Sequence, residues 1–125
     1  NEETIVAAQI ETKDALENID EICAIDGLDM AFVGPGDLCT DMGLTAKHGL
    51  KKSFGTPEYE NACKVVVEKC KKYGKIPGFW NSDVTGKAEM GYRFLVVDGD
   101  IHSMQDALTK SLKEKRELME KAGVL

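Results

Sequence analysis

The sequence lacks a long apolar run, an excess of basic residues and a signal peptide, and each absence excludes a class of protein. No apolar run approaches the roughly 18 residues of a membrane span, and the first residues lack the basic-then-apolar pattern of a secretory signal. The 16 Lys and Arg residues stand against 22 Asp and Glu, for a net charge of -6, so neither nucleic acid nor an anionic membrane is expected as a partner. We expect a soluble, cytoplasmic protein.

Paired cysteines are also missing. The four cysteines include no Cys-x-x-Cys motif, so a zinc knuckle or a thioredoxin-type site is unsupported. Cys63 and Cys70 lie seven residues apart on one face of an expected helix, and reduced, buried thiols are the better interpretation.

The order of apolar patterns predicts four strands that alternate with four helices. Strands are expected at 5–10, 30–33, 76–80 and 93–97, and helices at 12–27, 56–74, 84–90 and 103–123. A long polar connection is expected between the second strand and Thr56. The last helix is expected to begin with a capping box formed by Ser103 and Asp106. Its apolar stripe is expected to be buried, and comprises Met104, Leu108, Leu112, Leu118 and Met119.

This βαβαβαβα order indicates an α/β protein with a parallel sheet and right-handed crossovers. The 125 residues contain no linker or shift in composition, so a single domain, 1–125, with a real core is expected. Four βα units are also half of an eight-stranded barrel. Periodicity alone does not decide between a small open sheet and half of a barrel.

Two carboxylates at strand ends are the strongest functional signal. Glu11 follows the first strand, and Asp37 follows the second in the loop Gly34-Pro35-Gly36-Asp37. In a parallel sheet both would lie at the carboxyl-terminal edge, where ligands bind. Hard divalent cations prefer carboxylate oxygens, so the pair predicts half of a metal site. The alternatives are a solvated strand end for Glu11 and a turn cap for Asp37.

The histidines and a second acidic pair are weaker candidates. His48 lies in the polar connection, where a surface histidine is favoured over a general base. His102 follows the fourth strand and is better explained as an ordinary helix residue, although a strand end can lie near the site. Asp98 and Asp100 favour turn chemistry over a second acidic site.

A resemblance to a known family rests on five segments of the sequence. They are Gln9-Ile10-Glu11-Thr12, residues 15–22, Gly27-Leu28-Asp29, Phe32-Val33-Gly34-Pro35-Gly36-Asp37-Leu38, and residues 91–97 with Asp100. They resemble the HpcH/HpaI aldolase family of class II, metal-dependent pyruvate aldolases, which act on 2-keto-3-deoxy sugar acids and 4-hydroxy-2-oxo diacids. The interval of twenty-six positions between Glu11 and Asp37 is that of the family's metal ligands. The resemblance covers nearly the whole chain but only the carboxyl-terminal half of a member, and so implies half of a (β/α)8 TIM barrel.

The resemblance also implies a site and an activity. Glu11 and Asp37 would bind Mg²⁺ or Mn²⁺, the peptide N–H groups of Gly36 and Asp37 would hold the substrate carboxylate, and Gln9 would lie beside the substrate. The implied reaction is the cleavage of 4-hydroxy-2-oxo acids to pyruvate and an aldehyde.

The departures from the family limit this expectation. The family's acid-base His and pyruvate-binding Arg belong to the missing amino-terminal half, and Arg93 and Arg116 lie in the wrong context to replace the latter. We therefore assign no catalytic residue and expect the isolated chain to be inactive. The active protein is expected to be a longer chain, a homo-oligomer or a pairing of this chain with an amino-terminal half. In the family the last helix packs against a neighbouring subunit.

Two other functions stay open. One is a catalytically inactive half-barrel that acts as a binding or assembly module. The other is a lyase of the malyl- or citryl-CoA type, which the absence of a basic cluster for the CoA phosphates disfavours.

Overall fold

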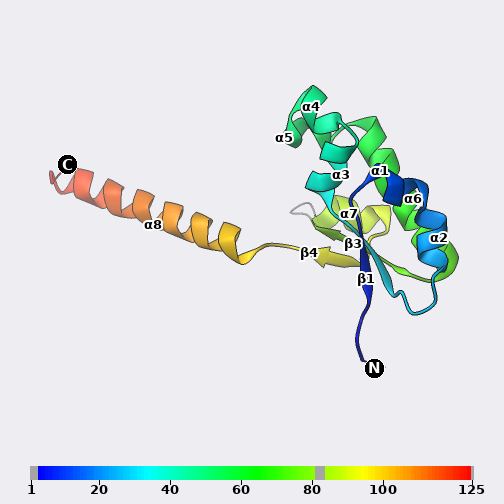
Figure 1. The fold of residues 1–125 in the computed structure, drawn as a ribbon. Coiled ribbons are helices and arrows are strands. Elements are labelled where there is room, and N and C mark those ends of the chain that lie inside the picture. The colour runs from blue at the N-terminus through cyan, green and yellow to red at the C-terminus, as the bar shows by residue number, and fades with distance from the viewer. Residues whose placement is uncertain (1–2, 81–83, 125) are drawn as a thin grey trace.

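The computed structural model describes residues 3–80 and 84–124, and it contains a four-stranded sheet in which every neighbouring pair is parallel (Figure 1). The strand order is β1-β2-β3-β4, the order of the sequence. This confirms the expected α/β class and the parallel sheet. The strands are β1 (Ala7–Ile10), β2 (Met30–Val33), β3 (Ile76–Trp80) and β4 (Phe94–Val96).

Helices fill the connections between the strands. The helices α1 (Lys13–Glu17) and α2 (Ile19–Ala24) follow β1, and α7 (Val84–Met90) follows β3. Four helices follow β2, namely α3 (Pro35–Asp41), α4 (Leu44–His48), α5 (Leu50–Ser53) and α6 (Pro57–Tyr73). The last helix, α8 (Asp100–Lys121), follows β4. No helix in the part of the chain that the structure describes has the length and apolar character needed to cross a membrane.

The core lies between the sheet and its helical layer. Ile10, Val33 and Phe79 point from the strands into this layer and are almost fully buried. The helix α6 packs against β2 and β3, and α2 packs against α6. Thr56 and Gly74 bound α6 as the sequence predicts, because the Thr56 hydroxyl accepts the Tyr59 N–H and Gly74 takes the left-handed conformation at the end.

The opposite face of the sheet carries a second row of side chains. Gln9, Phe32, Gly78 and Phe94 are partners in the register of the four strands, so they share one face. A Cβ atom at Gly78 would lie 2.6 Å from Cδ2 of Phe32, and glycine here lets the Phe32 and Phe94 rings meet edge-on across β3. Phe94 is nevertheless 44 % exposed, so this face of the sheet is open.

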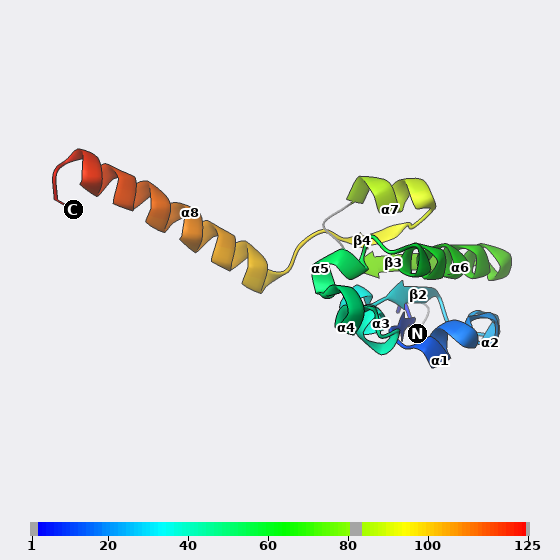
Figure 2. The same cartoon turned by 90° about the horizontal axis from the view of Figure 1, so that it is seen from above.

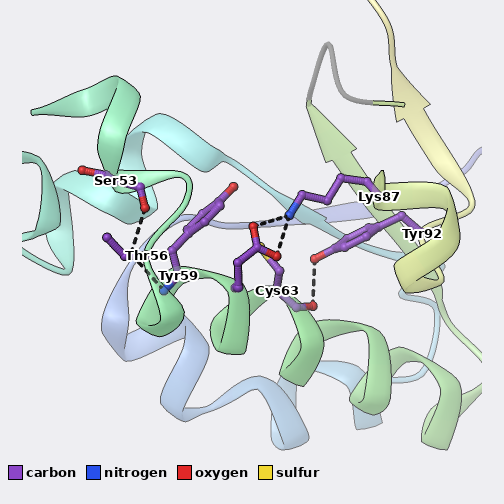
Figure 3. Close-up of polar contacts among 7 residues, drawn as sticks. Ser53, Thr56, Tyr59, Cys63, Lys87 and Tyr92 are labelled. Carbon is purple, nitrogen blue, oxygen red and sulfur yellow. Dashed lines mark hydrogen bonds and ion pairs between the residues drawn. The ribbon is translucent and has the colours of Figure 1, made fainter. Parts of the chain in front are cut away.

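A polar cluster joins α6 to α7 and the turn after it (Figure 3). The Lys87 side chain is almost fully buried, and its ammonium donates to both carboxylate oxygens of Glu60, at 3.1 and 3.3 Å. The Tyr92 hydroxyl donates to the Cys63 carbonyl at 3.0 Å. These contacts hold α7 and the start of β4 against α6.

The structure differs from the sequence-based expectation in two of the connections between strands. The single helix expected at 12–27 is divided into α1 and α2 at Asn18, whose side-chain amide donates to the Asp14 carbonyl at 2.8 Å, a local bond that competes with a continuous helix. The polar connection expected before Thr56 is mostly helical, because Leu38, Cys39 and Leu44 give it a buried side.

The expectations for the last helix are wrong in two respects. The helix begins after Gly99, and the Ser103 hydroxyl bonds to Asp98 at 2.5 Å instead of forming a capping box with Asp106. The apolar stripe is also not buried, since α8 extends away from the sheet (Figures 1 and 2) and Leu112 is 70 % exposed. The spacing of apolar residues identified a face of the helix but not a surface within this chain to cover it.

Candidate active site at the carboxyl ends of the strands

A cleft of about 590 Å³ lies at the carboxyl-terminal edge of the sheet. We call it the carboxylate cleft. Gln9 and Phe32 form its floor, the residues Gly34, Pro35, Gly36 and Asp37 form one side, and Trp80, Phe94 and Val96 complete it. The structure therefore brings three of the four residues expected from the sequence, Gln9, Gly36 and Asp37, to one cleft.

The fourth residue, Glu11, lies at the border of the cleft. Its Oε2 atom accepts a hydrogen bond from Nε2 of Gln9 at 2.6 Å. Both side chains lie directly over Gly34, where a Cβ atom would be 2.7 Å from Nε2 of Gln9 and 3.1 Å from Oε2 of Glu11. A Cβ atom at position 34 would force the ends of the Gln9 and Glu11 side chains to shift, so glycine lets this pair lie close to the backbone.

Asp37 enters the cleft from the first turn of α3. The helix begins at Pro35, so Gly36 and Asp37 occupy its second and third positions, where backbone N–H groups have no acceptor within the helix. A Cβ atom at Gly36 would have no neighbour within 4 Å, so the space in front of this residue is open. The turn thus presents a carboxylate and two peptide donors to one cleft.

Two hydrogen bonds hold the loop that carries Glu11. The Thr12 hydroxyl accepts the Ala15 N–H and begins α1 directly after Glu11. The Lys13 N–H donates to Oδ2 of Asp41, at the end of α3, at 2.7 Å. The loop of Glu11 and the helix of Asp37 are therefore joined to each other by Asp41.

The donor set suits a hard divalent cation that keeps most of its coordination for water and substrate. Within residues 3–80 and 84–124, no group of three or more His, Cys, Asp or Glu side chains is placed to hold a metal ion. Glu11 and Asp37 supply two carboxylates, and Mg²⁺ is commonly bound through only one or two. Gly36, in the same first turn as Asp37, has no neighbour within 4 Å of a Cβ atom, so space for a small ligand lies beside this carboxylate.

The weaker candidates lie elsewhere. His48 is exposed at the end of α4, as the surface interpretation predicts. Asp98 accepts from the Gly99 N–H and the Ser103 hydroxyl, which confirms turn chemistry and lowers the pKa of this carboxyl, chiefly through the Ser103 bond. Arg93 donates to the carbonyls of Ala88 and Tyr92, so its guanidinium is engaged outside the cleft.

The aromatic walls of the cleft were missed at the level of sequence. Phe32 and Phe94 were assigned only to their strands, yet they share the row of Gln9. Alternation along each strand from Gln9 outward could have placed them on the ligand-facing side. Trp80, at the end of β3, also lines the cleft.

The cysteines take no part in this site. All four are free and buried, which confirms the expectation for Cys63 and Cys70. Burial raises the pKa of the Cys39 thiol to about 11 and that of Cys70 to about 12. Such thiols remain protonated at neutral pH and behave as apolar core groups.

Relatives of the chain are similar over most of its length. A curated 4-hydroxy-2-oxo-heptane-1,7-dioate aldolase from Klebsiella pneumoniae is 35 % identical over 103 residues, which are 80 % of this chain and 37 % of that protein. A hydroxypyruvate/pyruvate aldolase from Sagittula stellata is 34 % identical over 110 residues, 86 % of this chain and 41 % of that protein. The chain therefore spans about two fifths of the length of these relatives.

Solved structures show the same arrangement. A crystal structure of an HpcH/HpaI aldolase/citrate lyase family protein from Burkholderia cenocepacia superposes with a TM-score of 0.78 at 28 % identity, over 92 % of this chain and 44 % of that one. An HpcH/HpaI aldolase from Desulfitobacterium hafniense superposes with a TM-score of 0.76 at 28 % identity. The match covers 90 % of this chain and 43 % of that one. The family model described as HpcH/HpaI aldolase/citrate lyase matches residues 1–99. The chain belongs to the HpcH/HpaI aldolase/citrate lyase family.

Proposed function

We propose that this chain supplies the metal-binding and carboxylate-binding part of a class II pyruvate aldolase, a carbon-carbon lyase that cleaves 4-hydroxy-2-oxo acids to pyruvate and an aldehyde. The observation that carries the proposal is the meeting of Gln9, Gly36 and Asp37 in the carboxylate cleft, with the Glu11 carboxylate held at its border. The names of the curated relatives as aldolases support the reaction class.

The carboxylates of Glu11 and Asp37 would hold Mg²⁺ or Mn²⁺. When bound, the cation supplies Lewis-acid polarisation of the substrate's keto group. Gln9 fixes the Glu11 carboxylate through the 2.6 Å hydrogen bond, so one ligand is oriented before the ion arrives. Asp41 joins the loop of Glu11 to the helix of Asp37.

The first turn of α3 would bind the substrate's carboxylate. The N–H groups of Gly36 and Asp37 are free of helical acceptors, and Gly36 has open space before it. Pro35 has no N–H and a fixed backbone, so it begins the helix without adding a competing donor. The apolar wall of Phe32 and Phe94 would exclude water from the other side of the ligand.

A further part of the protein would complete the site. The open face of the sheet and the exposed stripe of α8 both need cover, because a parallel sheet is normally buried on both faces. In the proposed (β/α)8 barrel, an amino-terminal half would pair with the edges of β1 and β4 and cover the face of Phe94. The stripe of α8 would pack on a neighbouring subunit in a homo-oligomer.

The alternative is an inactive half-barrel that binds or assembles. One observation favours it: within the described residues, the carboxylate cleft is lined by no histidine, lysine or arginine. An acid-base group accelerates such reactions by about 10²- to 10⁴-fold. Whether an amino-terminal half supplies this group therefore decides between the enzyme and the binding module.

Metal binding provides the direct test of the carboxylate pair. Asp37→Asn keeps the size of the side chain and removes its charge, and we expect the affinity for Mn²⁺ in calorimetry to fall more than tenfold. Asp26→Asn is the matched control, since Asp26 is exposed in the turn before β2, at the opposite end of the strands. Equal Mn²⁺ affinity of the Asp37 and Asp26 variants would refute the assignment.

Activity is tested with Mg²⁺ or Mn²⁺ present, by release of pyruvate from a 4-hydroxy-2-oxo acid. We expect little or no cleavage by the 125-residue chain alone, with slow exchange of the pyruvate methyl protons for deuterium that Asp37→Asn abolishes. Addition of an amino-terminal half from a family member should restore cleavage. Restored assembly without any cleavage would favour the binding module.

A further inference from the structure

A second cavity opens beside the carboxylate cleft, and we call it the rim cavity. Its volume is about 660 Å³, within the range of about 300 to 1,000 Å³ that is common for small-molecule sites. The two hollows share Pro35, Gly36, Trp80 and Val96 as lining residues. The rim cavity therefore adjoins the carboxylate cleft at the first turn of α3 and at Trp80.

The walls of the rim cavity are largely apolar and come from separate elements. Leu50 and Phe54 reach it from α5 and the turn after it, Tyr59 from α6, Phe79 from β3 and Val97 from the end of β4. Phe79 and Tyr59 are almost fully buried and lie in the core, so this side of the cavity is rigid. Such walls suit a hydrocarbon or aromatic group better than a polar one.

The charges at the rim cavity disfavour an anion. Its single lysine, Lys87, already donates to both oxygens of Glu60, so that pair is neutral as a unit (Figure 3). Asp98 and Asp106 add two further carboxyl groups, and His102 lines the same side. The hydrogen bond from Ser103 lowers the pKa of Asp98, which keeps this group ionised at neutral pH.

We propose that the rim cavity receives the side chain of the aldehyde substrate, and that it selects an uncharged apolar or aromatic side chain over one that ends in a carboxylate. The inference rests on the proposed aldolase function and deepens it, because it assigns the aldehyde class. It also sets this chain apart from the Klebsiella relative, whose name specifies a dioate substrate.

Binding to the rim cavity can be measured without turnover. Trp80 is the only tryptophan of the sequence and lines both hollows, so its fluorescence reports on them directly. The ligands are 3-phenylpropan-1-ol and 3-phenylpropanoate, which share a skeleton and differ in charge. We expect saturable binding of the alcohol, and at least tenfold weaker binding of the carboxylate at low salt, with the difference reduced in 1 M NaCl.

A matched pair of variants locates the ligand. Val97 is 65 % exposed at the cavity wall and Val124 is 66 % exposed near the end of the chain, so an aspartate is tolerated at either position. Val97→Asp should weaken binding of the alcohol at least fivefold, and Val124→Asp should leave it unchanged. Absence of a saturable Trp80 response, equal binding of the two ligands, or equal effects of the two variants would overturn the proposal.

The same titrations separate this inference from the proposed function. Asp37→Asn should abolish tight Mn²⁺ binding and leave binding of the alcohol intact, because Asp37 does not line the rim cavity. If Asp37→Asn left Mn²⁺ binding unchanged while the alcohol still bound selectively, the aldolase assignment would be refuted and an apolar binding site would remain. Mn²⁺ binding at Asp37 without selective binding of the alcohol would refute only the rim cavity.

Discussion

The backbone N–H of Lys13 donates to the Asp41 carboxylate across 2.7 Å, and this hydrogen bond joins the two segments that carry Glu11 and Asp37, beside the backbone bond from the Gly34 N–H to the Ile10 carbonyl. Lys13 is the second residue after Glu11, and Asp41 ends the helix in whose first turn Asp37 lies. The relative placement of the two proposed metal ligands therefore depends in part on the Asp41 side chain, one helical turn after Asp37.

Asp41→Ala should weaken Mn²⁺ binding about tenfold, the lower end of the loss found for residues that orient metal ligands. Asp41→Asn keeps an oxygen acceptor for the Lys13 N–H and should restore most of the affinity. We expect only a small decrease of the melting temperature, because the Asp41 carboxylate is favourable at the start of α1, where it accepts the Lys13 N–H, but unfavourable at the end of α3. Calorimetry on both variants measures the effect, and equal affinities of the alanine and asparagine variants would contradict a positioning role.

Gly78→Ala should destabilise the protein by about 1–3 kcal/mol, the usual cost of forcing extra atoms into a packed site. The new Cβ atom would lie 2.6 Å from Cδ2 of Phe32 and 2.7 Å from Sδ of Met30, and the Phe32 ring would have to leave Phe94. Gly55→Ala is the control, because its nearest neighbour would be the Lys52 carbonyl at 3.9 Å. Urea unfolding measures the stability of both variants. Equal stabilities would contradict the prediction and show that the sheet can accommodate a Cβ atom at position 78.

The contrast between α6 and α8 shows how far the sequence could determine the fold. The bounds of α6 followed from Thr56, Pro57 and Gly74, because capping residues act through local backbone chemistry. The burial of α8 could not be predicted, because an apolar stripe specifies a face but not the partner that covers it. The stripe of Leu108 and Leu112 has no cover among the described residues.

The site shows a similar division. The positions of Gln9, Gly36 and Asp37 at one edge could be predicted, since parallel strands bring their carboxyl ends together. The close approach of Gly34 to Gln9 and Glu11 could not be predicted, because those two residues lie on another strand and its end. The rim cavity is beyond sequence reasoning for the same reason.

Asp20 should stabilise the protein at neutral pH and lose this contribution in acid. Hydrogen bonds from Lys69 first and Lys72 second lower the pKa of its carboxyl from 3.8 to about 2, and they tie α2 to α6. Because the folded-state pKa lies below the unfolded value, the contribution is complete above about pH 5 and declines as the pH falls from near 4 to 2.

The comparison of wild type with Asp20→Asn tests this pH dependence. Urea unfolding should show a constant difference between pH 5 and 7 that shrinks below pH 4. High salt should reduce the difference at neutral pH, because Asp20 and Lys72 are both partly exposed. A difference that is independent of pH would mean that the lysines do not act on the Asp20 charge.

The pair of Lys87 and Glu60 should be worth more than an exposed ion pair of this chain. The Lys87 ammonium lies 5.3 Å from the centre of the Tyr59 ring and 5.0 Å from that of Phe79, and its side chain is only 6 % exposed. Lys87→Met alone should cost about 1–3 kcal/mol, below the full penalty of a broken buried pair, because Glu60 can still be hydrated.

A double-mutant cycle with Glu60→Gln isolates the interaction. We expect a coupling of about 1–2 kcal/mol between positions 87 and 60, in the range for residues in direct contact. The cycle of Arg116→Gln and Glu120→Gln on α8 is the control: these side chains are 3.7 Å apart and exposed, so their coupling should stay below about 0.5 kcal/mol. If the two cycles gave equal couplings, burial against the Tyr59 and Phe79 rings would add nothing to the pair, and the attachment of α7 to α6 would have to depend on Tyr92 instead.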